Sequence, residues 1–325
     1  MAMIPMIRAI NHGLTAEFDR DEKVILIGLA ASAGSAYGYF TGFQNKYGKE
    51  RVLDMPLAET MYTTFAIGAA VAGFRPVVEF MYADFATYGM EGIANIAAKQ
   101  RYTSGGRYSA PITYLMPNGK SGGSGATHTQ TTEAWFANVP GLKIVAPTYP
   151  AEVKAYLQAS IRDDDPVLFF FDRFLFGLQG EVEDDNYVPT LTEGTKKMKE
   201  GADITLIGYH NALVVATEAA AEFEKETGLT VEILNTIMLV PFDTAPIYES
   251  VRKTGKVLLV TEAAERNSMM QNLSALIAEN CLDALKKPVK RVGAKNGVAP
   301  FGLANASFLY PTKEDYLNAL RELAK

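Results

Sequence analysis

Short apolar runs rich in β-branched residues alternate with segments of helical spacing along most of this chain. In the first half, the runs predicted as buried strands are 24–28, 77–80, 111–116, 142–146 and 167–171. The segments predicted as helices between or beside them are 7–20, 59–73, 89–102, 133–139 and 151–162. Because strands that alternate with helices form a parallel sheet covered on both faces, the pattern predicts a doubly wound α/β fold.

A change of composition separates this block from a second one. The segment 181–200 is acidic, then polar, then basic, and it shows no clear period, which is typical of an interdomain linker. Beyond it, strands are predicted at 204–208, 230–234 and 257–260, and helices at 212–225, 244–253 and 269–285. We therefore predict a doubly wound parallel sheet domain over 7–185, a linker over 186–200 and a smaller α/β domain over 201–325.

Length and charge exclude several classes of protein. A chain of 325 residues is long enough for two domains that each bury a core. The net charge of −6 argues against nucleic acid as the main partner, because phosphate binding needs a basic face. The single cysteine, Cys281, excludes an internal disulfide, so the reducing cytoplasm is the expected location. The sequence contains no run of eighteen or more apolar residues, so no membrane span is predicted.

The glycine-rich segment 117–125 matches two motifs only superficially. A phosphate-binding loop that ends at Lys120 needs a glycine where Tyr114 stands. The nucleophile elbow of α/β-hydrolases places its serine directly between a strand and a helix, whereas Pro117 and Asn118 separate Ser121 from the predicted strand. A flexible loop is the better interpretation, and a serine hydrolase acting through Ser121 is the weakest alternative. No dinucleotide fingerprint or zinc-ligand spacing is present.

Two titratable residues stand in settings that suit acid–base chemistry. Glu59 lies in the otherwise apolar run Met55-Pro-Leu-Ala-Glu59, and His128 follows the glycine-rich loop. Settings that keep a charge away from water shift its pKa. From spacing alone, two other interpretations stay open: Glu59 as a residue that stabilises a helix start, and His128 as a structural histidine.

These stretches also carry a family resemblance. Together with Arg101-Tyr-Thr-Ser-Gly-Gly106, Pro140-Gly-Leu-Lys-Ile-Val-Ala-Pro147 and Ile161-Arg-Asp-Asp-Asp-Pro166, they resemble the β chain of the thiamine-dependent decarboxylase of 2-oxo acid dehydrogenase complexes, the pyruvate, acetoin and branched-chain group. The similarity runs from about residue 7 to the end. It implies a pyrimidine-binding domain of thiamine diphosphate enzymes followed by a transketolase C-terminal-like domain.

The resemblance also implies roles for individual residues. Glu59 matches the carboxylate that hydrogen-bonds the pyrimidine N1′ of thiamine diphosphate and so stabilises the imino tautomer of the cofactor's own base. Phe85, in Tyr82-Ala-Asp-Phe85, matches the ring that stacks on the pyrimidine. Glu91 stands where relatives carry an aspartate of an acidic path between two active sites. His128 matches a channel histidine that assists acyl transfer to the lipoyl group.

Metal and partner expectations follow from the same resemblance. Ser160, Asp163 and Asp165 stand where relatives bind a structural potassium ion, largely through backbone carbonyls; without the resemblance, the run 163–165 indicates a solvated acidic turn. The Gly-Asp-Gly segment with which relatives bind the diphosphate and Mg²⁺ is absent. A separate α chain is therefore expected to supply that half of the site, in an α2β2 heterotetramer.

The function implied is that of an oxidoreductase β subunit. It would cleave the C–C bond next to the carbonyl of a small 2-oxo acid or of acetoin, and reductively acylate the lipoyl group of an acyltransferase. A split transketolase-type enzyme acting on sugars and a non-catalytic partner subunit are the alternatives. The chain departs from the family at Gly28-Leu-Ala30, which replaces an acidic pair, at 266–272, which replaces a glycine-rich loop, and at 301–305, which lacks a proline-rich segment.

Overall fold

The computed structural model of the chain describes residues 1–120, 123–183 and 187–325, which cluster into two compact units. The first unit comprises Met1–Asn118, Trp135–Val145 and Tyr149–Leu191. The second comprises Gly119–Ala134, Ala146–Thr148 and Thr192–Lys325. The boundary after Leu191 falls within the linker predicted at 186–200, of which Asn186 lies outside the described residues. The two units are considered separately below.

The sequence up to residue 182 forms short strands and helices in alternation. They are β1 (Ala2–Pro5), α1 (Met6–Arg20), β2 (Val24–Gly28), α2 (Phe43–Tyr47), β3 (Val52–Asp54), α3 (Glu59–Val71), β4 (Arg75–Glu79), η2 (Ala83–Thr87), η3 (Glu91–Ile96), η4 (Ala97–Lys99), α4 (Gln100–Thr103), β5 (Thr113–Asn118), α5 (Glu133–Ala137), β6 (Lys143–Val145), α6 (Pro150–Arg162), β7 (Val167–Asp172) and β8 (Gln179–Val182).

A parallel sheet forms the centre of the first unit. Its strands follow the order β6-β7-β5-β4-β2-β3, and each neighbouring pair is parallel. Strands β2, β5 and β7 are buried along their whole length, as near-continuous apolar runs of parallel sheets are. The helix predicted at 7–20 is α1, which packs against α6. The α/β fold expected from the alternating pattern is thus confirmed.

The helix predicted at 89–102 is more broken than expected. The structure divides this stretch into the π-helical turn η3, the 3₁₀ turn η4 and the short helix α4. Glycines let its backbone approach α3: a Cβ on Gly92 would lie 2.8 Å from Cγ2 of Thr63, and one on Gly89 would lie 2.7 Å from Oγ1 of the same threonine. Helical spacing carries no information about such close backbone contacts.

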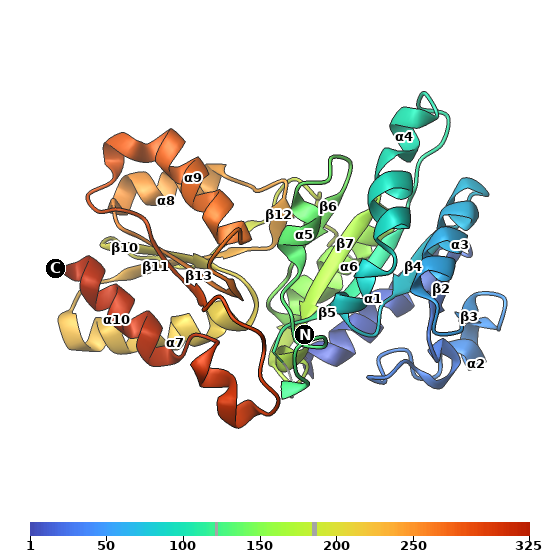
Figure 1. The fold of residues 1–325 in the computed structure, drawn as a ribbon, viewed down its shortest axis with the longest axis horizontal. Coiled ribbons are helices and arrows are strands. Elements are labelled where there is room, and N and C mark those ends of the chain that lie inside the picture. Colours follow the sequence, from blue (N-terminus) through green and yellow to red (C-terminus); the bar gives the residue numbers. More distant parts are fainter. Residues whose placement is uncertain (121–122, 184–186) are drawn as a thin grey trace. The chain divides into compact units, whose positions relative to one another are not determined.

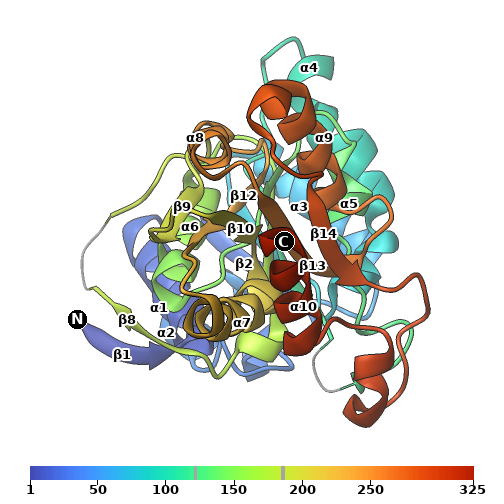
Figure 2. The same ribbon diagram turned by 90° about the vertical axis from the view of Figure 1, so that its left-hand side faces the viewer.

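The second unit contains a smaller sheet between helices. Its elements are β9 (Thr195–Lys199), β10 (Ile204–Gly208), α7 (His210–Thr227), β11 (Val231–Thr236), β12 (Met238–Val240), α8 (Ala245–Thr254), β13 (Val257–Ala264), α9 (Met269–Cys281), β14 (Lys290–Ala294) and α10 (Lys313–Ala324). The strand order is β14-β13-β10-β11-β9, and only β9 is antiparallel to its neighbour. Helices α8 and α9 cover one face, and α7 and α10 cover the other (Figures 1 and 2).

Several elements of the second unit differ from the prediction: strands β12 and β14 were not predicted, and neither were strand β9 and helix α10. Strand β9 lies in the segment predicted as linker; it is mostly exposed and pairs only with β11, so it lacks the buried apolar pattern that marks a strand. Helix α10 was not predicted, although Tyr316, Leu317 and Leu320 bury one helical face and Thr312 caps its start. In the described part of the chain, no helix combines the length and the apolar character needed to cross a membrane.

Candidate functional site

Glu59 is the first residue of helix α3. Its exposed fraction is 7%, and it forms no hydrogen bond or ion pair with any residue that the structure describes. The carboxylate therefore does not cap the helix, although the helix N-terminus favours a negative charge there. A buried carboxylate that no protein group satisfies is available to accept a hydrogen bond from a ligand.

Helix α3 is apolar on two sides. Tyr62, Ala66 and other residues on its inner side are buried. Leu57, just before the helix, and Met61 and Phe65 within it are 68%, 42% and 47% exposed, so the outer side of the helix is not buried in this chain alone. Residues four apart share one helix side, and a row of large exposed apolar side chains marks an interaction surface.

Phe85 lies in η2, the 3₁₀ turn that follows the carboxyl end of β4. Its ring is half-buried and meets the edge of the Tyr82 ring at 5.3 Å between centroids. Oγ1 of Thr60 donates a hydrogen bond of 2.6 Å to the carbonyl of Tyr88, which ties the first turn of α3 to the segment after Phe85. Glu59 and Phe85 thus belong to one region at the carboxyl end of the sheet, where ligands of open α/β sheets bind.

Glu91 begins the π-helical turn η3. Its exposed carboxylate accepts a hydrogen bond of 2.5 Å from Nδ2 of Asn95, one turn later. The turn packs directly on α3, because Gly92 leaves room for Thr63. The structure therefore ties Glu91 to the helix that carries Glu59, and π-helical turns are frequent at functional sites.

Glu79, the last residue of β4, is a site residue that the sequence analysis missed. It is 1% exposed, and its Oε1 accepts a hydrogen bond of 2.7 Å from the Tyr39 hydroxyl. Burial raises the pKa of the Glu79 carboxyl to about 7, although the bond from Tyr39 acts in the opposite direction. The sequence feature that could have identified Glu79 is its position as a charged residue within the otherwise apolar run 77–80.

His128 belongs to the second unit. Its half-buried ring places Nδ1 2.9 Å from Oγ1 of Thr127. The next residue is anchored, because the Tyr310 hydroxyl donates to the carbonyl of Thr129 at 2.9 Å. Gly125, at φ +84°, precedes His128, and a Cβ there would lie 2.6 Å from the Phe301 ring. Ser121, the residue of the hydrolase alternative, lies outside the described residues.

A polar cluster of the second unit also escaped the sequence analysis. Nζ of Lys120 forms an ion pair of 2.6 Å with Oε1 of Glu262, and Nδ2 of Asn211 donates to the same oxygen at 2.6 Å. Lys120 was considered only for a phosphate-binding loop, which the sequence excludes. Its partner comes from β13, about 140 residues later, and no short-range pattern predicts such a pair.

The residues expected to hold potassium lie around the end of α6. Oγ of Ser160 donates back to the carbonyl four residues earlier in its own helix. The carboxylate of Asp163 accepts a bond of 2.5 Å from Lys143, and that of Asp165 accepts one of 2.7 Å from Arg101. Cationic side chains thus neutralise both carboxylates, and a bound cation would depend on backbone carbonyls. The potassium site stays a prediction.

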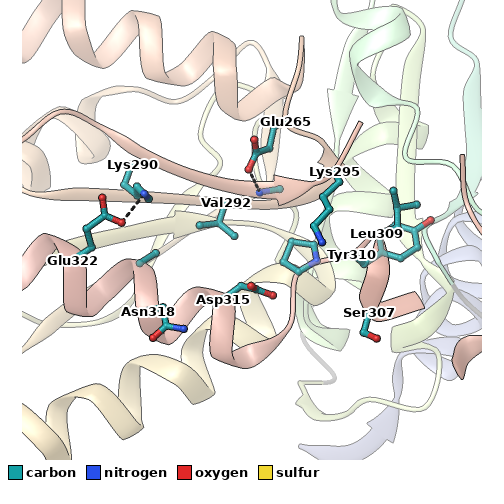
Figure 3. Close-up of a pocket in the computed structure, with 13 residues that line it drawn as sticks. Glu265, Lys290, Val292, Lys295, Ser307, Leu309, Tyr310, Asp315, Asn318 and Glu322 are labelled. Atoms are coloured by element: carbon teal, nitrogen blue, oxygen red, sulfur yellow. Dashed lines mark hydrogen bonds and ion pairs between the residues drawn. The ribbon is translucent and has the colours of Figure 1, made fainter. Parts of the chain in front are cut away.

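A cavity of about 350 Å³ in the second unit lies between β14 and α10 (Figure 3). Its charged groups are largely paired: Lys290 contacts Glu322 at 2.7 Å, and Asp315 accepts a hydrogen bond from the backbone N–H of Thr312 at the start of α10. None of the predicted site residues lines it. The candidate site therefore remains the region around Glu59 and Phe85.

Comparison with protein families gives two matches that together span most of the chain. Residues 2–177 match the family described as transketolase, pyrimidine binding domain. Residues 194–315 match the family described as transketolase, C-terminal domain. Glu59, Phe85 and Glu91 lie within the first match, and so does His128, which the structure groups with the second unit.

Curated proteins of similar sequence cover the chain from end to end. The 2-oxoisovalerate dehydrogenase subunit beta of Bacillus subtilis is 38% identical and aligns over 100% of both chains. The acetoin:2,6-dichlorophenolindophenol oxidoreductase subunit beta of the same organism is 34% identical over 99% of this chain and 97% of that protein. The mitochondrial pyruvate dehydrogenase E1 component subunit beta of Dictyostelium discoideum is 34% identical over 98% and 90%.

A solved structure supports the fold. A split gene transketolase, an inactive beta4 tetramer, superposes with a TM-score of 0.77 over 99% of this chain and 98% of that chain, at 21% identity. That likeness concerns the fold alone, whereas the identities to the dehydrogenase β subunits hold over full length. The chain therefore belongs to the family of transketolase-like β subunits of 2-oxo acid and acetoin dehydrogenases.

Proposed function

We propose that the chain is the β subunit of a thiamine-diphosphate-dependent dehydrogenase that acts on a small 2-oxo acid or on acetoin. The enzyme cleaves the C–C bond next to the carbonyl and reductively acylates a lipoyl group. The observation that carries the proposal is Glu59: a carboxylate 7% exposed, at a helix start, without a hydrogen bond or ion pair to the described residues. The family match to a pyrimidine-binding domain names a ligand for it.

The residues around Glu59 fit the pyrimidine half of the cofactor. Glu59 would accept the hydrogen bond of the ring nitrogen N1′, and burial strengthens such a bond because water does not compete. Phe85 would pack against the ring face. Thiamine diphosphate itself supplies the carbon nucleophile and the electron sink, so this chain contributes orientation and proton control.

The diphosphate half of the site is assigned to an α subunit in an α2β2 heterotetramer. The relatives are named as β subunits, which implies a partner chain. This sequence contains no Gly-Asp-Gly segment to bind the diphosphate and Mg²⁺. The exposed apolar row of Leu57, Met61 and Phe65 borders Glu59 on the same helix, which supports a partner docked at that edge of the site.

The substrate side is assigned to His128, which would assist acyl transfer to the lipoyl group. Its setting supports that role: the loop before it pairs with the segment at Phe301, and the Tyr310 hydroxyl holds the residue after it. A lipoyl-bearing acyltransferase is the proposed second partner. The potassium site at Asp163 and a cytoplasmic location, which the free cysteine Cys281 supports, belong to the same proposal.

The test is co-expression with the α chain of a neighbouring gene, followed by titration of the purified pair with thiamine diphosphate. We expect saturable binding by the pair and none by either chain alone. Reduction of 2,6-dichlorophenolindophenol then measures turnover of 2-oxoisovalerate, pyruvate and acetoin. Turnover of sugar phosphates instead would establish the transketolase alternative, and a pair that binds no cofactor would establish a non-catalytic subunit.

A further inference from the structure

The first unit contains a second buried acid besides Glu59. Glu79 ends strand β4, and the turn η2 with Phe85 begins a few residues later. On β2, the neighbouring strand, Gly28 faces Glu79 so closely that a Cβ there would lie 2.9 Å from Oε2 of Glu79. The absence of a side chain at residue 28 therefore makes the space that the Glu79 carboxyl occupies.

The two oxygens of Glu79 have different surroundings. Oε1 accepts the hydroxyl of Tyr39 at 2.7 Å, whereas Oε2 is buried without a hydrogen-bond partner among the described residues. An ionised carboxylate needs several donors, and an unsatisfied oxygen is costly in a dry interior. The aromatic ring of Tyr37 stacks behind Tyr39 at 5.9 Å, so water is excluded on that side.

Tyr62 connects Glu79 to Glu59. Residues three apart on a helix are neighbours on one face, so Tyr62 lies beside Glu59 on α3. Its ring packs 5.7 Å from Phe80, the residue next to Glu79. Burial raises the pKa of Tyr62, and the charges of Glu59 and then Glu79 raise it further, so the phenol lies within electrostatic range of both carboxyls.

We propose that Glu79 carries a proton below neutral pH and serves the cofactor site as a positioning residue, because its neutral form fills the dry space between Gly28 and Tyr39 without an unsatisfied charge beside the helix that carries Tyr62 and Glu59. The proposal rests on the proposed function. The described groups around Glu79 are uncharged: Tyr39, backed by Tyr37, comes from the segment 31–43, Tyr62 from α3, Gly28 from β2, and Leu115 from β5.

Ionisation of Glu79 should lower the kcat of the assembled enzyme. When the pH rises and Glu79 ionises, a buried charge with one hydrogen-bond donor appears within electrostatic range of Tyr62. Such a charge draws donors or water toward itself, which disturbs the packing of Tyr62 on α3 and with it the placement of Glu59. We therefore expect kcat of the assembled enzyme to fall by about threefold or more as Glu79 ionises.

The protonation of Glu79 is measured on this chain without cofactor. Difference infrared spectroscopy detects the carbonyl stretch of a protonated carboxyl, which we expect in the wild-type chain at pH 6 and not in E79Q. Y39F removes the hydroxyl that donates to the ionised Glu79 carboxylate, which should raise the pKa of Glu79 further. The carbonyl band should then disappear at a higher pH than in the wild type. E232Q is the matched control, because Glu232 is 1% exposed but is paired with Lys253.

The kinetic measurement uses the assembled α and β chains. E79Q should keep the wild-type melting temperature at pH 6 and lose the fall of kcat across neutral pH, whereas Y39F should shift that fall upward. An infrared spectrum without an acid band, or a pH profile of kcat that is the same in wild type, E79Q and Y39F, overturns the inference. A wild-type pair without thiamine-dependent turnover overturns the proposed function instead, and the infrared titration still decides the state of Glu79.

Discussion

Glu59 and Glu79 are both more than nine-tenths buried in the first unit, yet their surroundings differ. Glu79 accepts a hydrogen bond from Tyr39 and lies in the sheet, whereas Glu59 stands at a helix start without a bonding partner in the described structure. Burial without a hydrogen-bond partner destabilises the folded chain, which supports the proposal that Glu59 binds a ligand.

The first prediction concerns Glu59→Gln. The variant should retain the melting temperature of the wild type within a degree or two, because no hydrogen bond is lost. Turnover of the assembled enzyme should fall by roughly 100-fold or more, since an amide cannot share the pyrimidine proton. Steady-state kinetics and thermal unfolding of the same preparation measure both. Glu50→Gln, at an exposed position, is the control, and normal turnover by E59Q would refute the assignment.

The second prediction concerns stability and pH. The pKa of Glu79 rises from 4.5 in the unfolded chain to about 7 in the folded one, so between these values the folded state binds more protons. Its contribution to stability is therefore fully present below pH 4.5 and is lost as the pH rises through 7, by roughly 3 kcal/mol.

Urea unfolding at pH 5 and at pH 8 measures this loss. The free energy of unfolding of the wild type should fall between the two values by more than that of E79Q, which carries no titrating group at this position. All other titrating groups are the same in the two chains, so their contribution drops out when the unfolding free energies of wild type and E79Q are subtracted. Parallel pH dependence of wild type and E79Q would show that Glu79 ionises normally.

At the scale of elements, helix α3 has two functions. Its inner side packs the first unit through Tyr62 and Ala66, and its first residue is Glu59. Its outer side presents Met61 and Phe65 to solvent, in line with Leu57 before the helix. A row of large exposed apolar side chains of this kind marks a surface on which another chain docks.

The third prediction tests this outer side. Phe65→Asp should weaken association with the α chain by at least about tenfold, because a charge replaces an apolar contact in the interface, and such losses reach 1–2 kcal/mol or more. The fold should persist, since Phe65 is 47% exposed. Analytical ultracentrifugation of the mixed chains gives the affinity. Leu282→Ser, at a 72% exposed site of the second unit, is the control and should bind normally.

At the scale of the whole molecule, the proposed function makes the chain one half of an enzyme. It belongs to a family of β subunits and has a pyrimidine-type site without a diphosphate-binding segment. Among the residues described by the structure, no group of three or more His, Cys, Asp or Glu could hold a metal ion. The proposed function accordingly assigns to the α subunit the Mg²⁺ that would accompany thiamine diphosphate.

The fourth prediction follows from the proposed division of the cofactor site between the two chains. A chelator added to the assembled enzyme should release the cofactor and lower the melting temperature, because a ligand that binds the folded state stabilises it in proportion to its occupancy. The isolated β chain should melt at the same temperature with and without the chelator. A chelator effect on the isolated chain would place a metal site in this subunit.

The sequence by itself determined the alternating α/β architecture and the family, because periodicity and motif order are local properties, and its domain bounds stay a prediction. It singled out Glu59, Phe85, Glu91 and His128 through the resemblance, and their roles stay predictions. It did not predict helix α10, whose apolar spacing was present, nor strand β9, whose exposed residues leave no such pattern.

Only the tertiary structure decided which side chains meet. The surroundings of Glu79, on which its proposed role depends, arise because β4 pairs with β2 and brings Gly28 against it, and because Tyr39 folds back from a segment forty residues earlier. Which side of helix α3 is exposed likewise depends on how far the sheet beneath it extends. Burial and hydrogen bonding are properties of residues distant in sequence, so the pKa of an acid within a strand is set by the fold and not by its neighbours in the chain.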